Sequence, residues 1–411
     1  MGRCPLPYYA GMGLHRRTGY GRSDTEERVA HEIDALAAEL HEISMEIHSH
    51  PEVGYEEKEA CRLLSDRLEQ AGFQVERGIA GLETAFLARH PGRTRGPKVA
   101  ILAEYDALPG LGHACGHNLI ATAALGAALG LKGLMDSIDG SLMVVGSPAE
   151  EKVRGKIPIV ESGLFEGTAA ALMVHPRGDT QLGRLFLATT NMSMVFHGKS
   201  SHAAAAPDQG INALDGCIAT FNGTNALKKH LRDDVRLHGV ILEGGTAANI
   251  VPERTRAVFS IRARDRAYLE SVIAKVKACA EAGATMSGCT VEVTMEPVCA
   301  EMNFNRTLSE AFGQNAEILG HKVLPLTLTV GGGSTDMGNV SQVVPAIHPF
   351  LKIGDSSLTP HTREFLEAAR TEEAQRYLLD SAKMLAMTAI DVWTDRDLLR
   401  RVREEFEHSR K

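Results

Sequence analysis

Short apolar runs that alternate with helical sequence are the feature that most constrains the fold of this chain. Three runs of strand length lie at Val99–Ala103, Leu142–Val145 and Ala169–Val174. Apolar residues spaced by three or four precede them, between residues 25 and 51 and again near Lys58–Ala71. Strands that alternate with helices indicate βαβ units. The sequence therefore predicts an α/β domain with helices on both faces of a mostly parallel sheet.

A different order of elements occupies the middle of the chain. The pattern there predicts strand, helix, strand, strand, helix and strand, at Met192–Phe196, Gly210–His230, Val235–Leu242, Thr255–Arg262, Arg266–Ala282 and Thr290–Met295. This order is typical of a small ferredoxin-like α+β domain. We therefore expect a tail at 1–24, an α/β/α domain made of 25–188 and 299–411, and an inserted domain at 189–298.

Composition narrows the class of partner. The 411 residues carry a formal net charge of −8, which argues against nucleic acid as a main partner and favours a small-molecule substrate. The seven cysteines have no paired spacing, which suits a reducing compartment such as the cytoplasm. No apolar run reaches the roughly 18 residues of a membrane span, so we expect no membrane partner.

The stretch HACGH places soft side chains directly before an apolar helix. Cys115 and His117 would point about 200° apart on a helix but to the same side of an extended loop, so we expect both to precede the helix, whose apolar run starts at Leu119. The helix dipole favours the thiolate, the form that binds metal. The alternative is a buried cysteine beside a histidine with its hydrogen bonds satisfied.

Polar side chains also follow each predicted strand. Asp106 follows the first strand, the adjacent Glu150 and Glu151 follow the second, and His175 follows the third; His361 lies beyond a further predicted strand at 347–353. Taken singly, these residues are explained equally well as turn formers or surface charges. Because open α/β sheets place ligands at the carboxyl ends of their strands, we expect these side chains to converge.

This set of side chains predicts a metal site. Cysteine, histidine and glutamate suit zinc, and manganese or cobalt are also compatible. Two metals about 3.5–4 Å apart would lower the pKa of a shared water and polarise a substrate oxygen. Glu150 would serve as general base and later return the proton to a leaving amine. The predicted chemistry is metal-assisted hydrolysis.

Seven ordered motifs resemble those of the M20 metallopeptidase family, in its amidohydrolase branch. That branch includes aminobenzoyl-glutamate hydrolases, indole-acetyl-amino-acid hydrolases and proteins like peptidase M20 domain-containing protein 2. The motifs are GLGHACGHN, SPAEE, MVHP, SSHAAAAPDQGINA, GGTAANIVPE, STDMGNVS and LTPHTREF, and HSHPEVGYEE fits as well. The resemblance implies a two-metal hydrolase whose inserted domain acts as a lid and forms a homodimer.

Position by position, the resemblance implies roles for the converging residues. The implied metal ligands are Cys115, His117, Glu151, His175 and His361. Glu150 matches the catalytic base, and Asp106 matches the carboxylate behind the ligands. Many M20 peptidases have a His-x-Asp motif where this chain reads Glu104-Tyr105-Asp106, which leaves the filling of both metal positions open.

In the lid, the resemblance implies contacts to substrate. His202 matches a histidine that enters the partner subunit's site and stabilises the oxyanion. Asn249 and Arg262 match substrate-contacting positions. His238 lies in a family motif, and Ser334 lies in GGGSTDMG, which lacks the lysine of a phosphate-binding loop. For His238 and Ser334, packing and turn formation remain alternatives.

The competing classes are weaker. Gly110-x-Gly112 is spaced wrongly for a dinucleotide-binding loop, and a non-catalytic protein would have no reason to keep every ligand and the base. We therefore expect a metal-dependent amidohydrolase that cleaves the amide of an N-acyl or N-aroyl amino acid or a dipeptide-like substrate. The alternative on the same site is a hydrolytic deaminase of an aromatic amine or amidine.

Overall fold

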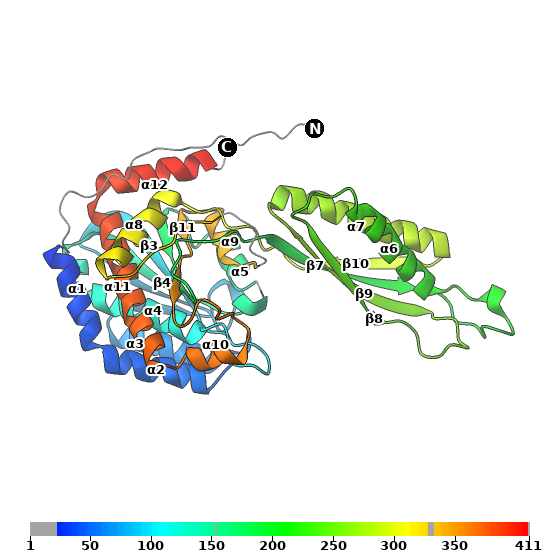
Figure 1. Cartoon of the computed structure of the whole chain (residues 1–411), viewed down its shortest axis with the longest axis horizontal. Coiled ribbons are helices and arrows are strands. Elements are labelled where there is room, and N and C mark those ends of the chain that lie inside the picture. The colour runs from blue at the N-terminus through cyan, green and yellow to red at the C-terminus, as the bar shows by residue number, and fades with distance from the viewer. Residues whose placement is uncertain (1–22, 153, 328–332, 410–411) are drawn as a thin grey trace.

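The structure, a computed structural model, describes residues 23–152, 154–327 and 333–409. Nearly all of the expected tail at 1–24 therefore lies outside the described residues. Figure 1 shows a rounded α/β part, which contains both ends of the described chain, and an elongated part that projects from it. The elongated part carries the strands and helices between β7 and β10.

A six-stranded sheet forms the centre of the rounded part. Its strands, in spatial order, are β1 (Gln74–Arg77), β2 (Phe86–Pro91), β4 (Asp139–Ser147), β3 (Thr94–Glu104), β5 (Thr168–Leu172) and β11 (Ala346–Ile347). The last four are parallel to one another. Strand β2 is antiparallel to its neighbour β4, and β1 is antiparallel to β2. Two further strands, β6 (His175–Arg177) and β12 (Phe350–Lys352), pair in parallel beside it.

Helices cover both faces of this sheet. Alternate residues of β3 enter different cores: Val99 and Ile101 on one side, Ala100 and Leu102 on the other. The first core is completed by α1 (Asp24–Ala35), α2 (Ala37–Ser49), α3 (Lys58–Gln70), α4 (His117–Lys132), α8 (Arg306–Ile318) and α11 (Glu372–Thr394). The second contains α5 (Lys156–Glu161) and α9 (Met337–Ser341). This is the expected α/β/α arrangement.

The elongated part has the predicted ferredoxin-like fold. Its elements are β7 (Ala188–His197), α6 (Ala213–Lys228), β8 (Arg236–Glu243), β9 (Arg254–Ala263), α7 (Arg266–Ser287) and β10 (Thr290–Met295). The antiparallel strand order is β10-β7-β9-β8, and α6 and α7 lie together on one face of the sheet (Figure 1). The predicted fold class is confirmed, and the residue numbers that divide the domains stay a prediction.

Several local expectations differ from the structure. The strand expected within 344–353 is two short strands, β11 and β12, and the helical pattern at 25–50 divides at Leu36. The C-terminal helical sequence forms α10 (Arg363–Ala368), α11 and an unpredicted α12 (Arg396–Ser409). Among the described residues, no helix has both the length and the apolar character to cross a membrane.

Candidate metal centre and active site

The candidate site lies where parallel strands end. Asp106 follows β3, Glu150 and Glu151 follow β4, and His175 comes shortly after β5. Cys115 precedes α4, whereas His117 is the first residue of that helix, which begins two residues before the apolar run that starts at Leu119. Between the two, Gly116 has φ +77, and a side chain there would press against Pro176 at 2.6 Å. A glycine is therefore needed to bring the cysteine loop against the His175 strand.

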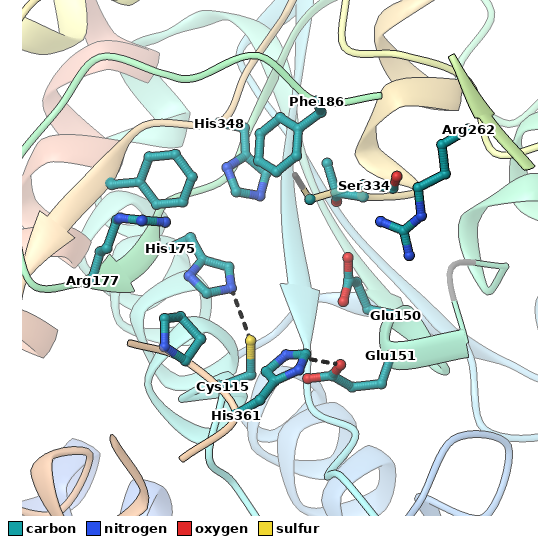
Figure 2. A pocket seen from close by; sticks show the side chains of 14 residues that line it. Cys115, Glu150, Glu151, His175, Arg177, Phe186, Arg262, Ser334, His348 and His361 are labelled. Carbon is teal, nitrogen blue, oxygen red and sulfur yellow. Dashed lines mark hydrogen bonds and ion pairs between the residues drawn. The ribbon is translucent and has the colours of Figure 1, made fainter. Parts of the chain in front are cut away.

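The five predicted donors converge. The Cys115 Sγ lies 3.4 Å from His175 Nε2, and His361 Nε2 lies 3.3 Å from a Glu151 carboxylate oxygen (Figure 2). One donor atom from each of Cys115, His117 and His175 lies within 4.8 Å of the others, and so do donors of Cys115, Glu151 and His361. Cys115 is common to both groups. These two groups offer two adjacent positions for cations, and donor atoms of Glu104, His117 and Glu150 form a third group within the same distance limit.

Each of the two buried histidines has one ring nitrogen held by a hydrogen bond and directs the other toward this cluster. His175 donates Nδ1–H to the Pro176 carbonyl at 2.8 Å, and His117 Nδ1 contacts Asp106 Oδ1 at 3.0 Å. Burial and the neighbouring His348 lower the pKa of His175 to about 3, so its ring is neutral. Burial would lower the pKa of His117, but Asp106 raises it well above the usual value, so a cation at His117 Nε2 would displace a proton. Histidine ligands in metal sites are held by this kind of hydrogen bond from the second nitrogen.

Unpaired buried atoms show that the residues fit a metal. His117 Nε2 and Glu151 Oε1 are fully buried and have no hydrogen-bond partner. Leaving such a group unsatisfied costs about 1–3 kcal/mol. Burial, with Glu151 nearby, raises the pKa of the Cys115 thiol, so the helix N-terminus alone does not produce the thiolate expected from the sequence. A divalent cation would satisfy all three donors.

Asp106 connects two of the candidate ligands. One carboxylate oxygen contacts His117, and the other accepts the Glu151 N–H at 2.9 Å. Burial would raise the pKa of Asp106, but the His117 charge and these hydrogen bonds together lower it. Asp106 therefore stays ionised and holds both neighbours by hydrogen bonds, and its part in catalysis stays a prediction.

Glu150 lies beside the donors on the cavity wall (Figure 2). Burial, with Glu104 and Glu151 nearby, raises the pKa of its carboxyl well above the usual value. The preceding residue, Ala149, has φ +56, a conformation that costs energy for a residue with a side chain. His361 shares this conformation at φ +66. Backbone strain at both positions is typical of functional sites.

The N-terminal motif supports that strained turn. The buried Glu57 accepts the Ala149 N–H at 2.7 Å and the Thr84 hydroxyl at 2.9 Å. Gly54 permits close packing, because a side chain there would meet the Ala149 Cα at 2.9 Å. The HSHPEVGYEE segment thus holds the backbone directly before Glu150.

A cavity of about 270 Å³ opens onto these residues. Arg262, from the end of β9 nearest the α/β part, and Ser334 line one side of it, and Phe186 and His348 line another (Figure 2). Phe350, whose ring packs against both Phe186 and His348, also lines the cavity. The Ser334 hydroxyl donates to the Leu187 carbonyl at 2.7 Å. Arg262 and Ser334 therefore both line the cavity, and their contact with substrate stays a prediction.

The remaining lid residues lie elsewhere. The loops after β7 and β8 are at the end of the lid farthest from the α/β part (Figure 1). There His202 pairs with Ile250, and the Asn249 carbonyl accepts the Ala203 N–H at 3.0 Å. His238 is exposed on the outer strand β8. These three residues do not line the chain's own cavity, and their roles stay predictions.

Sequence reasoning missed a second buried charge cluster. The Lys156 ammonium contacts Glu104 at 2.5 Å and Asp336 at 2.6 Å, and all three side chains are fully buried. It also missed the aromatic wall of Phe186, His348 and Phe350. The charge cluster was missed because the charges in EEKVRGK are typical of a solvent-exposed segment. The aromatic wall was missed because it joins residues more than 160 positions apart. Only the polar residues directly after strands gave a local signal.

A metal-binding hydrolase of the C–N bond is the class that this fold and donor set define. The family model of Peptidase family M20/M25/M40 matches residues 100–383. The mouse Xaa-Arg dipeptidase is 40% identical over 397 residues, which cover 93% of this chain and 92% of the relative. The chain belongs to the M20 peptidase family.

Two further proteins extend the comparison. One of the subunits of the p-aminobenzoyl-glutamate hydrolase of Escherichia coli is 29% identical, over 91% of this chain and 93% of its own. A dinuclear metal binding peptidase of the M20 family from Bacillus subtilis shares the fold with a TM-score of 0.65 at 20% identity, over 87% and 99% of the two chains. A two-metal site is therefore known on this fold.

Proposed function

We propose that this protein is a metal-dependent amidohydrolase that cleaves the amide of an N-acyl or N-aroyl amino acid or a dipeptide-like substrate. The observation that carries the proposal is the buried donor cluster, which contains unpaired atoms and of which every member but His117 lines the same cavity as Glu150. The related dipeptidase and aminobenzoyl-glutamate hydrolase bear names that fit such an amide.

We assign the donor atoms of Cys115, His117, Glu151, His175 and His361 to two divalent cations, zinc or manganese. When bound, the two ions lower the pKa of a water and polarise the scissile carbonyl. Glu150 takes a proton from the attacking water and returns it to the leaving amine. Its raised pKa suits both steps, because a carboxyl that ionises nearer neutrality exchanges protons more readily at that pH.

Substrate binds across the junction between the two parts of the chain. Arg262 on one side of the cavity pairs with the free carboxylate of the amino-acid product, and Ser334 lies beside that contact. The acyl group then points to the opposite, aromatic side (Figure 2). This orientation places the amide beside Glu150 and the donor cluster.

We propose further that two copies of this chain form a homodimer through the lid, in the cytoplasm. The outer strand β8 exposes Val240 and Leu242 at 53% and 52% of their surface, and an exposed apolar edge strand favours pairing with another chain. His202 Nδ1 accepts the N–H groups of Ala204 and Ala205, both at 3.2 Å. Its proton therefore lies on Nε2, free to stabilise an oxyanion in the partner subunit.

Metal analysis by mass spectrometry, on protein purified without chelator, tests the proposal. A parallel screen of N-acyl amino acids, dipeptides and aromatic amines detects released amino acid and ammonia separately. We expect about two metals per chain and release of an amino acid. Ammonia from an aromatic amine would replace the amidase with a deaminase, and a chain that stays inert after zinc or manganese is added would refute metal-assisted hydrolysis.

A further inference from the structure

Three rings form one wall of the cavity. The His348 ring lies 4.9 Å from Phe186 and 5.2 Å from Phe350, measured between centroids, and it stacks on His175 at 5.5 Å. Arg177 lies over the ring of Phe350, 5.3 Å from its centroid. Because aromatic rings at these distances pack favourably, the wall is held in place before a ligand arrives.

His348 is the polar member of this wall. Its side chain is buried, with 2% exposure, and its Nδ1 has no hydrogen-bond partner. Figure 2 shows the edge of the ring that carries its nitrogens facing the cavity, between His175 and Ser334. A neutral imidazole offers one donor and one acceptor. A buried nitrogen left unpaired next to a cavity indicates that a bound ligand completes its hydrogen bond.

The position of the wall decides which part of a substrate it meets. The donor cluster lies at the base of the cavity, Arg262 lies to one side, and the three rings lie to the other (Figure 2). If the carboxylate pairs with Arg262 and the amide lies over the donors, the acyl group contacts the rings. This step rests on the proposed amidohydrolase function.

We propose that His348 is a specificity-determining residue that hydrogen-bonds an amino or hydroxyl group on the acyl part of the substrate. Phe186 and Phe350 pack against the carbon atoms of the same acyl group. The enzyme therefore favours amides whose acyl group is compact or flat and carries one such polar group over amides with a purely hydrocarbon acyl group of the same shape.

Two pairs of nearly isosteric substrates test this preference. N-(4-aminobenzoyl)-L-glutamate is compared with N-(4-methylbenzoyl)-L-glutamate, and L-alanyl-L-arginine with isobutyryl-L-arginine. For at least one pair, we expect the native enzyme to show a kcat/KM about tenfold higher for the amino member, the effect of one hydrogen bond. His348→Phe keeps an aromatic ring but removes the nitrogens, so the ratio should fall to about one.

Metal content and melting temperature of the variant are measured beside the kinetics, because His348 touches His175. If His348→Phe is not folded or loses metal, His348→Leu repeats the comparison without a ring, and His230→Phe on the lid surface is the control. An unchanged ratio in a folded, metal-loaded variant would overturn the proposal, as would a native enzyme with no preference in either pair. If the native enzyme cleaves no amide of any kind, the proposed function itself fails.

Discussion

Two neighbouring clusters of buried charged and polar side chains differ in whether their hydrogen bonds are complete. In the lysine cluster, the Lys156 ammonium contacts Glu104 and Asp336, and Asp336 also accepts the Lys156 N–H at 2.8 Å. In the donor cluster, formed by Cys115, His117, Glu151, His175 and His361, buried atoms have no partner. Glu104 joins the two, because its second oxygen is unpaired and lies 3.7 Å from His117 Nε2.

This difference indicates that the lysine cluster stabilises the fold and that the donor cluster serves the reaction. Burial would lower the pKa of Lys156, but Asp336 and Glu104 raise it, so the lysine remains charged. The lysine cluster joins the end of β3, the start of α5 and the segment before α9, and its ammonium is paired with two carboxylates, although the second Glu104 oxygen faces the donor cluster unpaired. The donor cluster needs a cation and opens onto the cavity. Substitutions in the first cluster should therefore affect folding, and substitutions around the second should affect turnover.

The largest effect is expected at Glu150. Glu150→Gln keeps the size of the side chain but removes the proton acceptor, so we expect kcat to fall on the order of 10²- to 10⁴-fold. Metal content, measured by mass spectrometry, should stay at the native level. Glu161→Gln at the exposed end of α5 is the control and should leave kcat unchanged. A Glu150→Gln enzyme with native turnover would remove Glu150 from the mechanism.

The lysine cluster is tested by Lys156→Met. Two buried carboxylates lose their cation, and a broken buried ion pair costs about 3–5 kcal/mol, which we expect as the loss in the free energy of unfolding by urea. Lys277→Met, at an exposed lid pair with Glu281, is the matched control and should change stability little. If Lys156→Met were as stable as Lys277→Met, the lysine cluster would not be what stabilises this part of the fold.

The carboxyl ends of the strands could be predicted from sequence, and the lysine cluster could not. Each apolar run of β3, β4 and β5 stops at polar residues, and strand parallelism brings those residues together. The lid could be predicted as well, since the order of its six elements matches the order expected from the sequence. Lys156, by contrast, lies among charges that suit a surface helix. Its burial depends on Asp336, 180 residues further along the chain.

Weak apolar patterns also hid parts of the fold. Strand β2 reads FLARHP, with an arginine and a histidine in its outer half, and it pairs antiparallel with β4. The aromatic wall needs Phe186 before the lid and His348 after it to meet across the whole inserted domain. No periodicity within either segment reports such a contact, so only the folded chain reveals it.

A smaller effect on turnover should follow from the lid. Removing one oxyanion donor costs about 10²- to 10³-fold in kcat, which we expect for His202→Ala without loss of metal, while His230→Ala at the end of α6 should be neutral. Co-expressing His202→Ala with Glu150→Gln under separate affinity tags decides which subunit His202 serves. If His202 acts in the partner, each mixed dimer regains one intact site and about half of native activity. An inactive mixed dimer, beside an impaired His202→Ala homodimer, would mean that His202 serves the site of its own chain.

The smallest effect is expected at Glu57, which tests how the strained turn before Glu150 is held. Glu57→Gln keeps one carbonyl oxygen as an acceptor but replaces the other oxygen with an amide N–H₂. The Ala149 N–H and the Thr84 hydroxyl both donate to Glu57, so one of them would face this N–H₂ instead of an acceptor. We expect a loss of about 1–3 kcal/mol in stability and a several-fold lower kcat with KM unchanged. Ala149 at φ +56 relaxes once its N–H is unpaired, and Glu150 moves with it.

Thr84→Val provides the matched comparison for Glu57. It removes only the hydroxyl that contacts the other Glu57 oxygen, so stability should fall while kcat stays native. Urea unfolding and steady-state kinetics on the two variants separate support of the fold from placement of the base. Equal losses of kcat in both variants would mean that Glu57 acts through general packing. Native kcat in both would mean that the turn at Ala149 holds Glu150 in place without Glu57.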